Sequence, residues 1–263
     1  MREIGDSVRQ SSDETPPFLA GEGAGEQGIL ARMIRAAEGL ENPARFLNPE
    51  TRRIVLEVFG KHEFKEVFGR YFERQEWTAA HTFRVTEGAV DVALALGIAR
   101  EKLEGLTLGA LLHDVGKFTV GADIVNKPGR LSAEEQARIN MHPQFGVEIV
   151  EALLQKPEFA SFAPHRDIVL AIVGGHHEWQ DQPYGTGRKE TDPETARMIQ
   201  IVAAADTFDA LTVERPYQKA VAAKNEIERI MKNRLTVPQK LIDLAVSRFA
   251  ETKEEEGLPE LVH

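Results

Sequence analysis

Apolar residues recur at helical spacing through most of the chain from residue 29 onward, and no convincing run alternates apolar with polar residues. A spacing of three to four residues is typical of amphipathic helices, whereas strands with one buried face alternate with a period of two. Helices are predicted over residues 82–97, 103–113, 145–154, 166–176, 194–212, 224–232 and 238–252. A capping box at Ser132–Glu135 begins one more helix. The pattern therefore predicts an all-α helical bundle.

The chain divides into four predicted segments. Residues 1–28 are rich in Gly, Pro, Ser and acidic residues, so a disordered tail is expected there. Residues 29–75 are expected to form a small helical N-terminal extension, whose role the sequence does not indicate. Residues 76–253 form the main domain, and residues 254–263 begin with an acidic run and form a C-terminal tail.

Composition excludes several classes of protein. The chain of 263 residues has no cysteine, so a disulfide framework and a thiolate metal site are both excluded. Its net charge of −10 argues against general nucleic-acid binding, which usually needs a basic surface. We find neither a signal peptide nor a run of about 20 apolar residues, so no membrane insertion and a cytoplasmic location are expected. The oligomeric state is not indicated.

Histidines and aspartates follow apolar runs at several points in the chain. His113-Asp114 ends one such run, and Gly116-Lys117 follows, where the glycine is expected to let the chain turn away. His176-His177 ends a second run, and adjacent histidines on a helix point about 100° apart, so they can bind two different metal ions. Asp206 ends a third apolar run. Burying such groups without a metal would be costly.

A bundle with scattered histidines is the alternative interpretation. His81 or His142 taken alone fits that alternative better than it fits a metal site. Four sites taken together favour a metal centre: His81, His113-Asp114, His142 and His176-His177. Glu178 is a candidate partner of a ligand histidine. Asp209, three residues after Asp206, either supports the structure or orients a ligand, and the structural role is favoured.

The ordered set of motifs resembles the HD phosphohydrolase superfamily, and specifically its HD-GYP branch. The resemblance extends over about residues 76–250 and rests on six segments: His81-Thr-Phe-Arg-Val85, Leu111-Leu-His-Asp-Val-Gly-Lys117, Asp123-Ile-Val-Asn-Lys-Pro-Gly-Arg-Leu131, His142-Pro-Gln-Phe-Gly146, His176-His-Glu178, and Ala205-Asp-Thr-Phe-Asp-Ala-Leu-Thr212 with Arg215-Pro-Tyr217. It implies an HD-domain helical bundle with a metal centre inside. The implied metal ligands are His81, His113, Asp114, His142, His176, His177 and Asp206.

The resemblance also implies a cyclic di-GMP phosphodiesterase, often with iron or manganese bound. Asp114 would bridge the metals and act with Lys117 in catalysis, while Lys117 and Arg215 would contact substrate phosphate. The mechanism expected of two metals is attack of a bridging hydroxide on phosphorus. The alternatives are an HD phosphohydrolase for another nucleotide or small phosphate ester, and a non-catalytic sensor or adaptor that retains the metal site.

Three positions depart from the family pattern. The family's Asp-Gly-x-Gly-Tyr-Pro is replaced by Asp181 followed by Gln-Pro-Tyr-Gly-Thr-Gly over residues 182–187, and Tyr184 of this loop is expected to contact substrate. Trp77 stands where members with three metals tend to carry a glutamate, so two divalent ions are expected. Gln218 stands where a second basic residue is common.

Overall fold

The computed structural model describes residues 49–59, 61, 76–187, 192–213, 221 and 224–254. The elements within these ranges are α2 (Pro49–Phe59), α4 (Glu76–Ala95), α5 (Arg100–Leu112), α6 (Lys117–Val120), α7 (Ala122–Val125), α8 (Ala133–Ile139), α9 (His142–Leu154), the 3-10 helix η3 (Pro157–His165), α10 (Arg166–Gly175), α11 (Pro193–Thr212), α12 (Lys224–Arg234) and α13 (Gln239–Glu254). No strand occurs in these ranges, and one isolated antiparallel bridge joins Gln180 to Leu235. The predicted all-α fold is confirmed.

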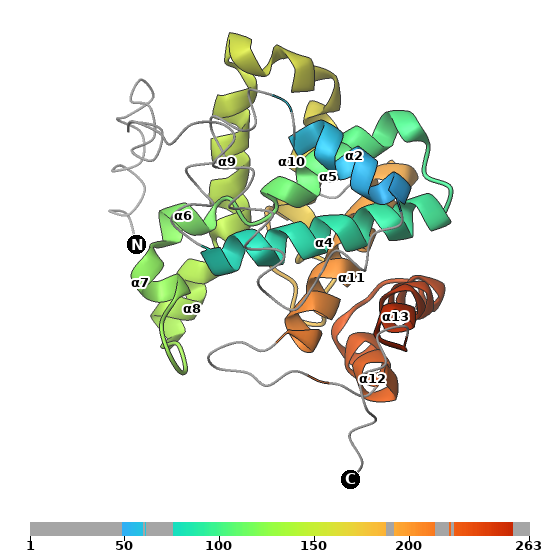
Figure 1. Ribbon diagram of the computed structural model, residues 1–263. Helices are drawn as coiled ribbons and strands as arrows, with labels where there is room; N and C mark the ends of the chain where they lie inside the picture. Colours follow the sequence, from blue (N-terminus) through green and yellow to red (C-terminus); the bar gives the residue numbers. More distant parts are fainter. Residues whose placement is uncertain are drawn as a thin grey trace.

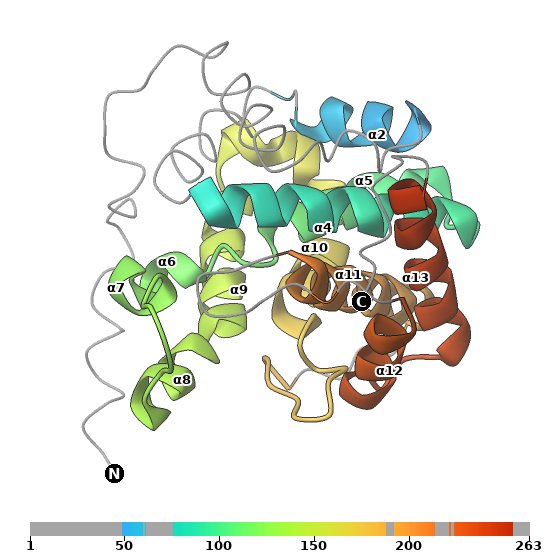
Figure 2. The ribbon, with the colours of Figure 1, turned by 60° about the horizontal axis from the view of Figure 1, so that its bottom comes forward.

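Helices α4, α5, α9, α10 and α11 make the most extensive contacts between helices in the described part of the chain. Helix α4 packs against both α5 and α11, and α10 packs against α5 and α9. Figures 1 and 2 show α4 crossing the molecule, with α5 and α11 beside it and the pair α12 and α13 at one side. Helix α5 begins with exposed Arg100 and Glu101 and is buried at Leu103 and then continuously from Gly105 to Leu112. A segment that is apolar all round belongs inside a bundle, and the C-terminal part of α5 is such a segment with the first ligand pair at its end.

The ends of the helices follow the sequence signals closely. Ser132 accepts a hydrogen bond from the backbone of Glu135, and the Glu135 side chain accepts one from the backbone of Ser132, so the predicted capping box is confirmed. Gly97 has a φ of +72°, the left-handed conformation expected after a helix end. The one-turn helices α6 and α7 and the 3-10 helix η3 were not predicted, since elements this short carry little periodicity.

Helix α2 falls within the predicted N-terminal extension. It packs on α4 and α5 through buried Ile54, Val55 and Val58. The predicted tail over residues 1–28, and most of the extension, lie outside the described residues, so the domain boundaries stay predictions. Within the described part of the chain, no helix has the length and apolarity that a membrane crossing requires.

Candidate metal centre

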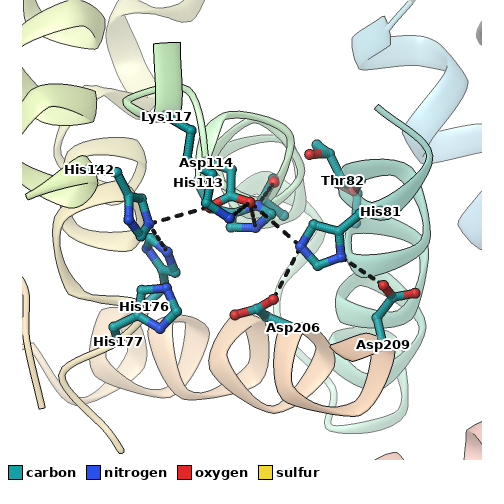
Figure 3. A network of polar contacts seen from close by, with 12 residues as sticks. His81, Thr82, His113, Asp114, Lys117, His142, His176, His177, Asp206 and Asp209 are labelled. Atoms are coloured by element: carbon teal, nitrogen blue, oxygen red, sulfur yellow. Dashed lines mark hydrogen bonds and ion pairs between the residues drawn. The ribbon is translucent and has the colours of Figure 1, made fainter. Parts of the chain in front are cut away.

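The seven predicted ligands meet in the interior of the bundle (Figure 3). His81 lies on α4, His142 begins α9, and Asp206 lies on α11, while the pairs His113-Asp114 and His176-His177 directly follow α5 and α10. Candidate ligand atoms of one group lie within 4.8 Å of one another, and this group consists of Asp114, His142, His176 and His177. A second such group consists of His81, His113 and Asp114. Asp114 belongs to both groups.

Three of these histidines are oriented by the backbone of their own helical turn. Nδ1 lies beside the carbonyl oxygen three residues earlier, at 2.7 Å for His113, 2.8 Å for His142 and 3.0 Å for His176. A carbonyl oxygen only accepts hydrogen bonds, so Nδ1 must donate in all three rings. In a neutral ring the proton is then on Nδ1, and Nε2 presents its lone pair to the centre.

The chemistry of these nitrogens fits a metal ion. Nε2 of His142 lies 3.2 Å from Nε2 of His176, so two lone pairs face each other across a buried space. Nε2 of His113 is buried and has no hydrogen-bond partner among the residues that the structure describes. Buried polar atoms normally have partners, and metal ions bound in the centre would provide a partner for each of these nitrogens.

The protonation states of the histidines also favour the binding of a metal ion. Burial lowers the pKa of His142 to about 3 and the pKa of His177 to about 4. Burial also holds the pKa of His176 well below its usual range. These three rings are therefore neutral near pH 7, the form in which imidazole binds metals.

The two aspartates of the predicted ligand set are charged in spite of their burial. Burial by itself would raise the pKa of Asp114, but the Lys117 ammonium, 2.5 Å from Oδ2, and His113 outweigh it and hold that pKa well below its usual range. Burial likewise opposes the charge of Asp206, and its hydrogen bond with His81 outweighs this effect, so its pKa is also held well below the usual range. The buried carboxylate of Asp114 and the largely buried carboxylate of Asp206 concentrate negative charge beside the neutral histidines, which attracts a cation.

His81 is held between carboxylates. Its Nε2 lies 3.2 Å from Oδ1 of Asp206 and 3.6 Å from Oδ2 of Asp114, and its Nδ1 lies 2.7 Å from Oδ2 of Asp209. Arg84 binds the Asp209 carboxylate through Nε and Nη2. Asp209 thus contacts a predicted ligand, which supports the less favoured of its two sequence interpretations, that it orients a ligand. The signal available in the sequence was its position one helical turn after Asp206.

Replacing Asp209 by asparagine should weaken metal binding about 10- to 100-fold, the usual effect of losing the partner of a ligand histidine. The amide keeps the shape of the carboxylate but loses the charge that orients and polarises His81. Competition with a fluorescent chelator measures the affinity. Asp167→Asn is the matched control, because the side chain of Asp167 is 85% exposed and lies on the surface. Equal affinities for the two variants would contradict the orienting role.

Of the three residues predicted to contact substrate, the structure describes Lys117 and Tyr184. Lys117 begins α6, and its side chain is 23% exposed, so it borders the centre while paired with Asp114. The ring of Tyr184 stacks on His177, with centroids 4.3 Å apart and planes inclined by 24°. Arg215 and Gln218 lie outside the described residues, as does the side chain of Trp77.

The loop over residues 181–187 packs against the double histidine. The backbone N–H of Gly187 donates to Oε1 of Glu178 at 2.7 Å, and the backbone N–H of Thr186 donates to the carbonyl of Gly174 at 3.1 Å. The carboxylate of Glu178 therefore holds the loop, and no described contact joins it to a ligand histidine as the sequence suggested. This attachment keeps Tyr184 beside His177.

This chain is similar to several known proteins. The HD domain family model matches residues 78–211. The 3'3'-cGAMP-specific phosphodiesterase 3 of Vibrio cholerae serotype O1 is 34% identical over 157 residues, which cover 59% of this chain and 31% of the relative. The cyclic di-GMP phosphodiesterase of Thermotoga maritima is 32% identical over 180 residues, covering 68% of this chain and 45% of the relative. The chain thus spans less than half the length of these curated relatives.

A solved structure shares the fold. An HDG"Y"P protein from Bdellovibrio bacteriovorus matches with a TM-score of 0.50 and 20% sequence identity, over 89% of this chain and 75% of that one. An identity this low shows the fold and no more.

Proposed function

This chain belongs to the HD domain family, and from that premise we propose that it is a metal-dependent phosphodiesterase for a cyclic dinucleotide, with cyclic di-GMP as the first candidate substrate. The predicted family is confirmed, and the curated relatives are phosphodiesterases of cyclic di-GMP or 3'3'-cGAMP. Both molecules are cyclic phosphodiesters of two nucleotides, so they share the bond that would be hydrolysed.

The observation that carries the proposal is the position of Asp114 in both groups of candidate ligands. A carboxylate has two oxygen atoms and can bridge two ions, so the ligand set suits two divalent metals. The remaining ligands would be His142, His176 and His177 on one side, and His81, His113 and Asp206 on the other. Nitrogen and oxygen donors without thiolates suit iron or manganese. Metals bound there would polarise the phosphate ester and activate water for attack.

Lys117 would supply a further positive charge at the centre. Its ammonium lies 2.5 Å from Asp114 and remains partly exposed, so it can reach an anionic group that enters beside the carboxylate. A fixed cation near a reacting phosphate stabilises the charge that develops in the transition state. Tyr184, stacked on His177, would offer a ring to a nucleobase or ribose, and Arg215 would contact phosphate.

The direct test is hydrolysis by metal-replete protein purified without air. Cyclic di-GMP, 3'3'-cGAMP, a cyclic mononucleotide and a nucleotide monoester would each be incubated with protein loaded with manganese or ferrous iron. We expect linear or mononucleotide products from the cyclic dinucleotides and a strong loss of rate in Lys117→Met. Lys240→Met, at an exposed position of α13, is the matched control.

Two results would contradict the proposal. Hydrolysis of mononucleotides alone would indicate an HD phosphohydrolase with another substrate. Tight binding of a cyclic dinucleotide without product would indicate a sensor or adaptor.

The second candidate substrate is 3'3'-cGAMP. It is favoured by the names of several relatives and by the altered residues 182–187, which place Tyr184 against His177. The ratio of kcat/KM for the two cyclic dinucleotides decides between them.

A further inference from the structure

The segment that follows the double histidine is attached to the C-terminal helices. Gln180 forms an antiparallel bridge with Leu235, which lies between α12 and α13. The backbone N–H of Asp181 donates to the carbonyl of Arg234 at 2.8 Å, and the backbone N–H of Thr236 donates to the carbonyl of Trp179 at 2.7 Å. Leu235 is itself buried in the core. The backbone of Gln180 is therefore fixed by an element far from it in the sequence.

The side chain of Gln180 reaches back to the metal centre. Its amide nitrogen lies 2.7 Å from Nδ1 of His177, whose ring is buried and stacked on Tyr184. With Nδ1 engaged by the amide, Nε2 is the nitrogen of His177 left for a metal. The ring is thus restrained in its plane by Gln180 and on one face by Tyr184.

His177 differs from the other predicted ligand histidines in the chemical group that contacts its Nδ1 atom. Nδ1 of His113, His142 and His176 contacts a backbone carbonyl, and Nδ1 of His81 contacts the carboxylate of Asp209. Those partners only accept hydrogen bonds, whereas an amide can donate through nitrogen or accept through oxygen. Because a ring that binds metal through Nε2 carries its proton on Nδ1, the amide oxygen would be the partner in the loaded centre.

We propose that Gln180 is a positioning residue for His177, and that its bridge to Leu235 makes the α12–α13 pair part of the support of the metal centre. The inference rests on the proposed function, because it takes His177 as a ligand. It adds that an uncharged amide, held from the C-terminal helices, sets the orientation and tautomer of this ligand.

Metal affinity measured by chelator competition tests the proposal without an activity assay. Gln180→Met keeps the length of the side chain and removes its hydrogen bond, while the bridge is made by backbone atoms and persists. We expect Gln180→Met to bind metal about 10- to 100-fold more weakly. Gln180→Glu should restore at least the wild-type affinity, because a carboxylate accepts from Nδ1–H. Gln239→Met, at an exposed position of α13, should bind as the wild type does.

A double-mutant cycle separates positioning from a general structural effect. In a His177→Ala background, Gln180→Met should change metal affinity by less than about twofold, because the ligand through which it acts is gone. Wild-type affinity in Gln180→Met, or a loss that persists unchanged beside His177→Ala, would overturn the inference alone. Metal binding without hydrolysis of any cyclic dinucleotide would overturn the proposed function alone. Wild-type protein that binds no metal would overturn both.

Discussion

Replacing Asp114 by alanine is expected to abolish metal binding and to lower the hydrolysis of a cyclic dinucleotide by more than about a thousandfold. Asp114 is the one residue shared by both groups of candidate ligands, so its loss removes an anionic donor from each. Metals contribute several kcal/mol of charge stabilisation to phosphoryl transition states. Each tenfold change in rate corresponds to about 1.4 kcal/mol, so a loss of this size follows.

Metal content after dialysis and the initial rate with cyclic di-GMP are the two measurements for Asp114→Ala. The matched control is Asp167→Ala, which removes a carboxylate whose side chain is 85% exposed. The control should keep both metal and activity. Circular dichroism checks that the variant folds, which is expected because Lys117, its ion-pair partner, is partly exposed and can turn to solvent. Full metal occupancy in Asp114→Ala would contradict the ligand assignment.

Replacing Gly116 by alanine is expected to lower the free energy of unfolding by about 3 kcal/mol or more, a large value for one methyl group. A Cβ atom at this position would lie 1.9 Å from the carbonyl oxygen of His142 and 2.5 Å from the backbone nitrogen of Gly146. These are backbone atoms of α9, so relief requires the helix itself to move. Since His142 is the first residue of α9, metal affinity should fall as well.

Urea denaturation of Gly116→Ala measures this loss, and Gly97→Ala provides the comparison. Gly97 has a φ of +72°, but a Cβ atom there would meet nothing within 4 Å, so only backbone strain of about 1–2 kcal/mol is expected. Metal affinity should be unchanged in Gly97→Ala. If Gly116→Ala proves no less stable than Gly97→Ala, the close approach of α9 is not what requires glycine.

Gly116 also shows where reasoning from sequence reached the right residue for the wrong reason. Glycine there was expected to let the chain turn away after His113-Asp114. Its φ of −66° is helical and accessible to any residue, so no special turn is made. The requirement comes from α9, which begins at His142 and passes against this backbone. A contact between distant segments has no local signature in the sequence.

The partners of the ligands were harder to predict than the ligands. Asp209 lies 128 positions from His81, and their contact exists because α4 packs against α11. Arg84 completes that contact from one turn further along α4. Gln180 resembles any polar loop residue in the sequence, and its role appears only once its backbone is seen bridged to Leu235.

The sequence determined the all-α class and, together with the family resemblance, indicated the candidate ligands. Helical periodicity is a local property, and apolar runs that end in His113-Asp114, in His176-His177 and in Asp206 show which polar groups each helix carries into the interior. Tertiary structure decided the rest: which carbonyl or side chain orients each ring, and which backbone approaches Gly116. Such contacts depend on how helices cross, and crossing is set by the packing of whole faces rather than by any one segment.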